Sequence, residues 1–242
     1  MDMRNFACME VIYEDNHIIV VNKRPGEIVQ GDKTGDTPLV ETVRQYIKEK
    51  YAKPGNVFCG VVHRLDRPVG GLVVFAKTSK ALARLNEMFR KGEVKKTYWA
   101  VTRNEPKEAC GRLHGYITSV ERNNKSYVSA EPKEGAKEAA LSYRLIGRSE
   151  RFYLLEVNLE TGRKHQIRVQ LASVGCPVKG DLKYGDKRSN PDGSISLMAR
   201  RIEFVHPVSK ELIDLTAPVP DDVVWRALEE SVRSEERRES RD

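Results

Sequence analysis

The pattern of apolar and polar positions predicts that an ordered fold begins close to residue 10. Two β-rich runs within residues 11–21 lie on either side of a polar Glu-Asp-Asn turn, which is typical of a β-hairpin. Thr37 precedes Pro38, so Thr37 is expected to cap a helix in which Pro38 takes the first position. That helix carries apolar residues at helical spacing and is expected to end before Pro54: Leu39, Val43 and Ile47.

Two buried strands are expected around a charged loop. Residues 57–62 and 72–76 are apolar and rich in β-branched side chains, and the charged residues 63–67 separate them. After the second strand, Thr78 or Ser79 can cap a helix that Gly92 would end. The charged loop is therefore expected to join two core strands and to be followed by a helix.

The second half of the chain again favours strands over helices. Strands are expected at 97–101, 140–146, 152–159, 196–204 and 212–215, and hairpins or loops at a sheet edge between 103 and 137. A helix is expected after Thr161 and Gly162, with Ile167, Leu171 and Val174 facing the core and Lys164 and Arg168 sharing another face. Asp221 or Asp222 is expected to cap a last helix, and the charged residues from Arg233 onward are expected to fray.

This order of elements predicts an α+β fold with a mixed, largely antiparallel central sheet and flanking helices. No internal repeat or linker rich in Gly, Ser or Pro separates independent domains. We therefore expect an N-terminal extension at 1–9, one domain at 10–230 and a charged tail at 231–242.

Composition adds a basic surface to this prediction. The 242 residues include 42 Lys and Arg against 35 Asp and Glu, a net charge of +7. Such a surplus favours a polyanionic partner such as nucleic acid, although a generic solvated surface fits the charge equally well. Four separate cysteines without zinc-site spacing are expected to be reduced thiols, and no run approaches the roughly 20 apolar residues of a membrane span, so a soluble cytoplasmic protein is expected.

One candidate for chemistry is Asp66, which stands between Arg64 and Arg67. A carboxylate held among guanidinium groups stays ionised when it is partly desolvated, and such a carboxylate can act as a nucleophile. Gly70 and Gly71 would allow a backbone or ligand to approach closely. Taken alone, the motif is more often an ordinary ion-pair cluster in a loop.

A second candidate is the basic stretch of residues 161–170, where positive charge gathers near the start of the predicted helix. A solvated basic helix face is the plainer interpretation of these charges. Tyr98 precedes Trp99 in a strand, so one ring should enter the core while the other faces a cleft or solvent. The histidines lack a second ligand at metal spacing, so no metal site is expected.

Three ordered motifs together resemble the RluA-type family of RNA pseudouridine synthases. They are Val62 to Gly71 with the sequence VHRLDRPVGG, Lys96 to Val101 with KTYWAV, and Gly162 to Val169 with GRKHQIRV. The early Asn22 to Gly26 and the later Lys179 to Gly185 resemble two further segments of that family. The resemblance extends from about residue 10 to about residue 218. It implies a pseudouridine synthase fold with a catalytic cleft, so the domain at 10–230 is expected to be catalytic.

The resemblance implies a catalytic aspartate at Asp66, an active-site tyrosine at Tyr98 and an arginine at Arg168 that pairs with the aspartate. Substrate contacts are expected from the residues around these three: His63, Arg64, Arg67, Arg163, Lys164, His165 and Gln166. Isomerising uridine breaks its N1 glycosidic bond and rejoins the base through C5, so no redox cofactor is needed and none is expected. The expected partner is ribosomal or transfer RNA, with no membrane and no obligatory protein partner, so a monomer is expected.

Two rival functions remain open from the sequence. One is a non-catalytic RNA-binding or RNA-chaperone protein with the same fold, and the other is a hydrolase that releases the base from a nucleoside bond. Gly70, Gln170 and Met198 depart from residues common in the family, which affects substrate details more than activity. We also expect no S4 RNA-binding domain before residue 10.

Overall fold

The computed structural model describes residues 9–239 and divides into two compact units. The first unit comprises Met1–Lys95 and Arg201–Ala217, and the second comprises Lys96–Arg200 and Pro218–Asp242. Strands β5 (Lys95–Thr102) and β10 (Leu197–Val205) each contain the boundary between units in their own sequence. Each unit is described by itself below.

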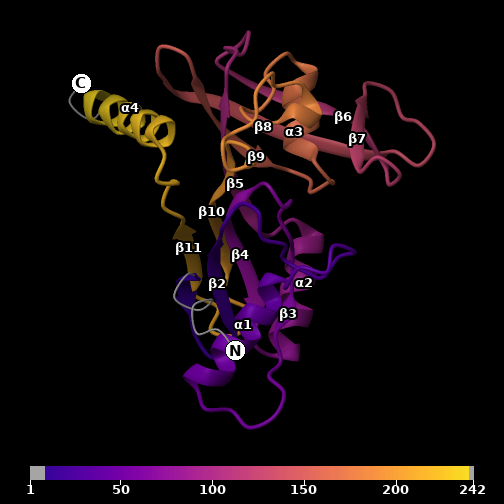
Figure 1. Cartoon of the computed structure of the whole chain (residues 1–242), viewed down its shortest axis with the longest axis vertical. Coiled ribbons are helices and arrows are strands. Elements are labelled where there is room, and N and C mark those ends of the chain that lie inside the picture. The colour runs from indigo at the N-terminus through magenta and orange to yellow at the C-terminus, as the bar shows by residue number, and fades with distance from the viewer. Residues whose placement is uncertain (1–8, 240–242) are drawn as a thin grey trace. The chain divides into compact units, whose positions relative to one another are not determined.

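The first unit is built on antiparallel strands and two helices (Figure 1). Strands β1 (Glu10–Glu14) and β2 (Ile18–Lys23) form the predicted hairpin, and β2 pairs on its other side with β4 (Gly70–Ala76). Strand β3 (Gly60–Val61) also pairs with β4, and β11 (Leu212–Thr216) pairs with the part of β10 in this unit. Residues 18–21 and 72–76 are almost fully buried, because β2 and β4 are covered on both faces.

The two helices of the first unit differ in how they begin. Helix α2 (Ser79–Lys91) has Thr78 as its N-cap, which accepts a hydrogen bond from the Ala81 amide, and Gly92 ends it in the left-handed region, as predicted. The N-cap of α1 (Leu39–Lys50) is Pro38, without a side-chain cap, so the prediction of a Thr37 cap is wrong.

Carbonyl groups from an earlier segment replace the missing cap of α1. The Leu39 amide donates to the Ile28 carbonyl at 2.7 Å, and the Val40 amide donates to the Val29 carbonyl at 3.2 Å. These contacts satisfy two of the four amides that a helix leaves open at its N-terminus.

The strand expected at 57–62 is shorter than predicted, because only the two residues of β3 form it.

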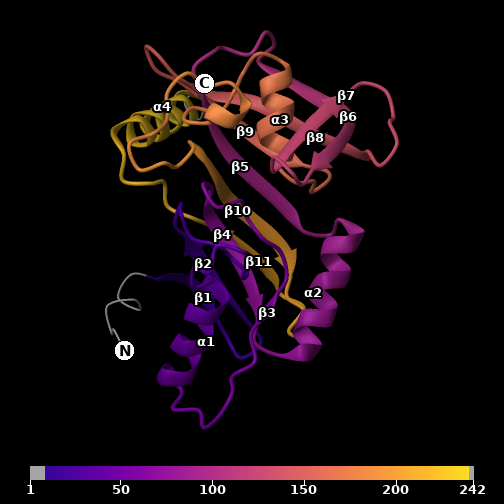
Figure 2. The ribbon, with the colours of Figure 1, turned by 45° about the vertical axis from the view of Figure 1, so that its right-hand side comes forward.

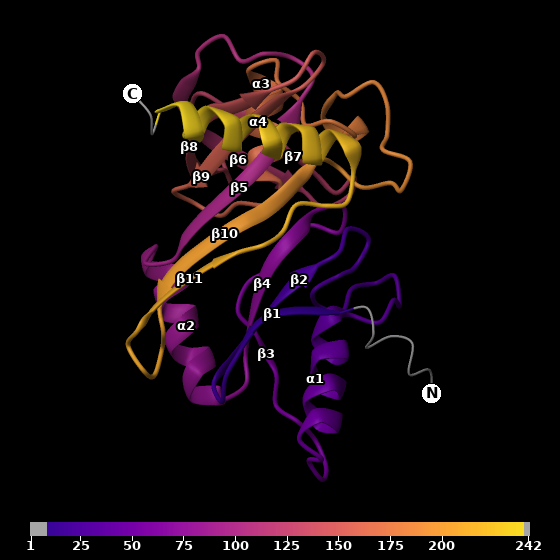
Figure 3. The ribbon, with the colours of Figure 1, turned by 90° about the vertical axis from the view of Figure 1, so that its left-hand side faces the viewer.

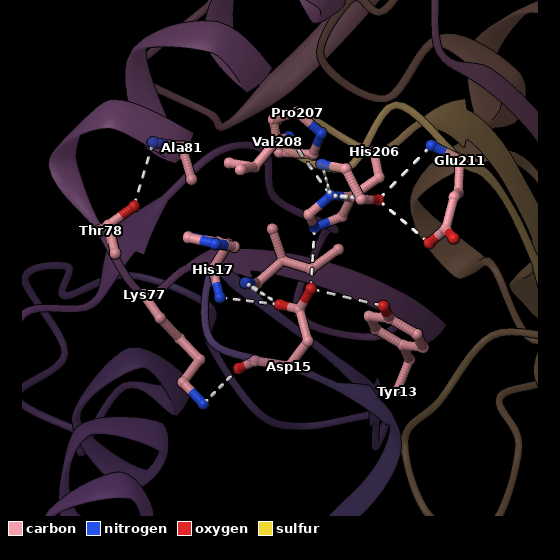
Figure 4. Close-up of polar contacts among 12 residues, drawn as sticks. Tyr13, Asp15, His17, Lys77, Thr78, Ala81, His206, Pro207, Val208 and Glu211 are labelled. Carbon is pink, nitrogen blue, oxygen red and sulfur yellow. Dashed lines mark hydrogen bonds and ion pairs between the residues drawn. The ribbon is translucent and has the colours of Figure 1, made fainter.

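A buried polar contact links the β1–β2 turn to the β10–β11 turn within the first unit (Figure 4). His206 is 1% exposed, and its Nδ1 accepts hydrogen bonds from the amides of Val208 and Ser209. Since Nδ1 is the acceptor, the ring proton lies on Nε2, which approaches Oδ2 of Asp15 at 2.9 Å. The other Asp15 oxygen accepts the amides of His17 and Ile18, so this carboxylate organises both turns.

The second unit contains a run of antiparallel strands in the order β5, β9, β8, β6, β7. Strands β8 (Lys137–Arg148) and β9 (Tyr153–Leu159) lie inside this order, and the hairpin of β6 (Cys110–Val120) and β7 (Lys125–Ser129) forms its edge. This arrangement confirms the hairpin expected at a sheet edge between 103 and 137. Helix α3 (Gln166–Ser173) packs against β7 and the short 3-10 helix η2 (Leu182–Tyr184) (Figure 2).

Helix α4 (Val223–Glu239) packs against β8 in the second unit (Figure 3). Asp222 caps it by accepting hydrogen bonds from the Val224 and Trp225 amides, as predicted for one of two candidates. The helix continues past Arg233 to Glu239, and residues 240–242 lie outside the described range, so fraying of the charged tail stays a prediction.

The α+β class with a largely antiparallel sheet is confirmed, since every strand pairing described above is antiparallel. Three cysteines within the described residues are free thiols, as expected: Cys59, Cys110 and Cys176. Over residues 9–239 no helix has the length and apolar character needed to cross a membrane.

Candidate active site

Asp66 lies in the loop between β3 and β4 of the first unit. Its side chain is partly buried, and its carbonyl accepts the Val69 amide at 3.0 Å, which closes a tight turn directly after the carboxylate. The Gly26 amide donates to the Arg67 carbonyl at 2.8 Å. The backbone that carries Asp66 is therefore fixed from two sides.

Lys23, at the end of β2, supports this loop through hydrogen bonds from its buried side chain. It is 1% exposed, and its ammonium donates to the carbonyls of Arg24, Arg67 and Val69 at 2.9, 3.1 and 2.7 Å. Burial lowers the pKa of Lys23 to about 8, although the Glu27 and Asp66 carboxylates act to raise it. The site residues named from the sequence omitted Lys23, and the available signal was its place in the early Asn22–Gly26 motif.

Of the two arginines beside Asp66, Arg67 does not pair with the carboxylate as expected from the sequence. Arg67 donates to Asp36 at 2.6 Å and to Thr34 at 2.8 Å, so its guanidinium is engaged by the loop that contains these residues. Arg64 is exposed. The interpretation that Arg67 surrounds the Asp66 carboxylate is thus wrong, because closer acceptors on the 32–36 segment bind it.

His63 is fixed within the first unit. Its Nε2 accepts the Val74 amide at 3.1 Å, and its ring stacks on Phe89 with centroids 4.8 Å apart and planes 21° from parallel. The close approach expected at Gly70 is also present, since a Cβ there would lie 3.3 Å from the Lys23 carbonyl oxygen. A substrate contact by His63 stays a prediction.

Tyr98 lies in β5 of the second unit, opposite Val157 of β9. Tyr98 and Trp99 are 8% and 7% exposed, so neither ring faces open solvent, and the expectation that one of them faces a cleft stays a prediction. The Arg200 guanidinium covers the Trp99 ring at 4.3 Å from its centroid, which accounts for the burial of that ring. Lys96, in the same strand, has its pKa lowered by burial.

Arg168 lies in helix α3 and is 5% exposed. Its Nε and Nη2 donate to the Asp181 carboxylate at 2.6 and 3.0 Å. Helix α3 begins only at Gln166, so Lys164 precedes it, and the prediction of a shared basic face with Arg168 is wrong. Val174 is also 39% exposed where a core position was expected, because it follows the last residue of the helix.

The turn that leads into α3 is held together by Gln166. Its Oε1 accepts the Thr161 hydroxyl at 2.8 Å and the Arg163 amide at 2.9 Å, while its Nε2 donates to the Ala140 carbonyl at 3.0 Å. Gln166 therefore shapes the turn. His165 is the N-cap of α3 with a left-handed backbone at φ +56.

The basic side chains of this turn are more accessible. Arg163 is exposed and donates to the Glu138 carbonyl at 2.8 Å, and Lys164 is exposed. Of the four substrate-contact candidates in this turn, these two have the exposure that a contact with RNA phosphates requires. Asp66 belongs to the first unit and Tyr98 and Arg168 belong to the second, so the union of the three in one site stays a prediction.

Comparison with solved structures identifies the fold class. Human RNA pseudouridylate synthase domain containing 4 matches with a TM-score of 0.75 over 93% of each chain, at 23% sequence identity. Human RNA pseudouridylate synthase domain containing 1 matches with a TM-score of 0.68 over 91% of this chain and 87% of the other, at 20% identity. The α+β architecture is therefore the pseudouridine synthase fold.

Sequence comparison then gives the family. The model for RNA pseudouridylate synthase matches residues 17–173. The RNA pseudouridine synthase YhcT of Bacillus subtilis is 34% identical, over 89% of this chain and 70% of its own length. Ribosomal large subunit pseudouridine synthase D of Xanthomonas campestris is 34% identical over 94% and 72% of the two chains, and tRNA pseudouridine synthase C of Vibrio parahaemolyticus is 30% identical over 91% and 93%.

This chain belongs to the RluA-type family of RNA pseudouridine synthases, which confirms the resemblance seen in its motifs. It is accordingly an isomerase that forms pseudouridine in RNA. The comparisons favour neither the non-catalytic RNA-binding protein nor the hydrolase.

Proposed function

We propose that this enzyme isomerises uridine in structured ribosomal or transfer RNA with Asp66 as its nucleophile. The observation that carries the proposal is the support of the Asp66 loop by the buried Lys23, whose ammonium binds two carbonyls of that loop. A reacting group benefits from being held in one geometry before the substrate arrives. Lys23 provides this support without placing its own side chain at the surface.

The reaction needs a nucleophile but no change in oxidation state. A carboxylate can trap the ribose or help to expel the base, and a covalent intermediate divides one difficult step into two easier ones. The base then turns and rejoins the sugar through C5, which loses its proton to water. In our proposal Tyr98 stacks on the uracil and assists removal of that proton, and Arg168 keeps Asp66 ionised and oriented.

The basic residues near Asp66, and those in the turn before α3, are proposed to hold the RNA. A uridine within a stacked helix or loop must be flipped out before it can react, and the exposed Arg64 is suited to occupy the vacated space. Arg163 and Lys164 would bind phosphates, which position RNA without reading its sequence. Three further candidates would contribute by fixing the backbone of the segments that carry these basic residues: His63, His165 and Gln166. Arg67 would contact the RNA while it stays paired with Asp36.

The names of two relatives support our proposal for the class of RNA. One relative is a ribosomal large subunit pseudouridine synthase and another is a tRNA pseudouridine synthase, so both RNAs are candidates for this enzyme. We also propose that the enzyme is a cytoplasmic monomer and that it needs no cofactor. Mapping pseudouridine in ribosomal and transfer RNA, in cells with and without this protein, would identify the target.

The nucleophile is tested with RNA that carries tritium at uridine C5. Wild-type enzyme should release label to water, and Asp66→Asn should abolish release while RNA affinity changes little. Glu87→Gln is the matched control, because it removes an exposed carboxylate on α2 that pairs with Lys91 and is not among the proposed site residues. Release by Asp66→Asn at the wild-type rate would exclude the nucleophile assignment, and release of free uracil by the wild type would support the hydrolase instead.

A further inference from the structure

The guanidinium of Arg168 is held by a buried carboxylate on the segment after α3. Asp181 is 1% exposed and binds the Nε and Nη2 edge of Arg168 with both oxygens, at 2.6 and 3.0 Å. A bidentate contact of this kind fixes the plane of the guanidinium as well as its position. It also directs the Nη1 edge away from Asp181.

Tyr184 supplies a second constraint on the same group. The Arg168 guanidinium carbon lies 5.0 Å from the centroid of the Tyr184 ring, within the range of a cation–π contact. The ring is itself anchored, because its hydroxyl accepts the Ser126 amide of β7 at 2.8 Å and lies 2.8 Å from Nδ1 of His165. The guanidinium is therefore fixed at its edge by Asp181 and over one face by an immobile ring.

The local fold places Asp181 and Tyr184 together. Asp181 precedes the 3-10 helix η2, of which Tyr184 is the last residue, and the Tyr184 amide donates to the Asp181 carbonyl at 3.1 Å. Residues three apart in such a helix lie on one side. A second carboxylate, Asp186, closes the loop by accepting the Gly180 amide at 2.6 Å and pairs with Arg103 at 3.0 Å.

We propose that Asp181 is a positioning residue for catalysis, and that with Tyr184 it fixes the orientation in which Arg168 meets the reacting carboxylate. This inference rests on the proposed function, in which Arg168 orients Asp66. Burial of Arg168 would be costly without a counter-charge, but neutralisation alone requires only a carboxylate nearby. The bidentate geometry and the stacked ring add a requirement for one orientation.

The distinction between neutralising and orienting Arg168 can be measured with Asp181→Glu. That variant keeps the counter-charge and lengthens the side chain by one methylene, so it should fold and yet displace the guanidinium. A shift of this size can lower the rate by about 100-fold. We expect kcat to fall while KM stays close to the wild-type value, because an interaction that acts in the transition state is lost.

Asp181→Asn and Tyr184→Leu complete the set, with Asp186→Asn as the matched control. Asp186→Asn removes a buried carboxylate from the same loop but leaves Arg168 and its partners intact, so it should retain kcat. Thermal unfolding of each variant gives the folded fraction to which kcat is normalised. If Asp181→Asn does not fold, Asp181→Glu and Tyr184→Leu still decide the outcome.

The outcomes separate this inference from the proposed function. Tritium release is measured for all variants beside Arg168→Leu. Loss of kcat in Arg168→Leu and in Asp181→Glu, with retention in Asp186→Asn, supports the positioning role. Wild-type kcat in Asp181→Glu, or equal loss in Asp186→Asn, overturns it while leaving Arg168 in place. Wild-type activity in Arg168→Leu overturns the role proposed for Arg168 itself, and the role of Asp181 with it.

Discussion

The ammonium group of Lys23 lies 2.7 Å from the Val69 carbonyl and 3.1 Å from the Arg67 carbonyl, so one buried cation joins β2 to the loop that carries Asp66. A lysine in such a place is costly to bury, and its carbonyl partners are what make the burial tolerable. The relationship explains why a buried charged residue stands at the end of a strand whose first four residues are apolar.

Replacing Lys23 with Met tests this support. The variant keeps most of the side-chain volume but removes the ammonium donor from the carbonyls of Arg24, Arg67 and Val69, of which the Arg67 carbonyl keeps the Gly26 amide. We expect a loss of roughly 2 kcal/mol or more in the free energy of unfolding and a lower kcat, since the Asp66 loop loosens. Urea unfolding and tritium release measure the two effects.

Lys80→Met is the control for this change. Lys80 is exposed on α2, so the same substitution there removes a charge without uncovering a buried acceptor. Its stability and kcat should match the wild type. A Lys23→Met protein as stable and active as this control would contradict the supporting role.

Glu14 should give the first unit a measurable dependence on acid. Burial acts to raise the pKa of Glu14, but hydrogen bonds from Lys50, Lys77, Tyr51 and Tyr46 lower it to about 2 from an ordinary 4.5. A lowered folded-state pKa means that the ionised form stabilises the fold above about pH 4.5, and that this contribution is lost as the pH falls toward 2. Glu14→Gln should therefore be less stable than wild type at neutral pH, with a gap that narrows across this range.

The control for Glu14→Gln is a substitution of a carboxylate whose ion pair is exposed to solvent. Glu87→Gln removes such a group, which pairs with Lys91 and is 50% exposed. Exposed pairs contribute little because water and salt screen them. The stability gap between wild type and Glu87→Gln should be small at every pH, and a Glu14→Gln gap that does not change with pH would contradict the prediction.

Some of this structure could be predicted from sequence because its causes are local. Thr78 and Gly92 bound α2 through contacts within a few residues, and both were evident as a cap and a stop. The start of α1 could not be predicted, because its amides bind carbonyls of the separate segment at residues 28–29. The cap expected from Thr37 was replaced by a tertiary contact.

The candidate site shows the same division. Asp66, Tyr98 and Arg168 were found as residue types in an ordered set of motifs, but their surroundings were not. The sequence places Asp66 between two arginines, yet Arg67 binds Asp36. Arg168 binds Asp181, thirteen positions away, which its motif did not reveal. Ion-pair choice depends on which groups the folded backbone brings within reach, and proximity in sequence is a poor guide to it.

Asp15→Asn should destabilise the link between the two turns of the first unit. The contact of His206 Nε2 with Asp15 departs from hydrogen-bond angles, so it is mainly electrostatic. Since Nδ1 must accept from Val208 and Ser209, the ring cannot change tautomer to suit an amide. The Nε2–H group of His206 would then face the N–H group of the introduced amide, at a cost of about 2 kcal/mol in the free energy of unfolding.

Thermal or urea unfolding measures this cost, with Asp214→Asn as the control. Asp214 forms an ion pair with Arg201 at the surface between β10 and β11, where a similar substitution should change stability by less than about 1 kcal/mol. Equal losses in the two variants would show that burial of the Asp15 contact contributes nothing beyond a surface pair.

Gly147 in β8 should control how α4 docks on the second unit. A Cβ at this position would lie 2.6 Å from the Ser231 hydroxyl, closer than such atoms approach, and 3.1 Å from Cγ2 of Val232, tighter than most such contacts. Gly147→Ala should therefore push α4 away and cost roughly 1–3 kcal/mol. Unfolding followed by tryptophan fluorescence includes a signal from this helix, since Trp225, one of the two tryptophans of the chain, lies in α4 and is 5% exposed.

A second substitution shows whether the clash is the cause. Ser231→Ala removes the nearest atom and should have little effect alone, because it gives up one partly buried hydrogen bond to the Leu228 carbonyl. Combined with Gly147→Ala it should recover part of the lost stability, with the remainder set by Val232. Additive losses in the double variant would mean that the two positions do not interact, and that Gly147 is required for a reason other than the approach of α4.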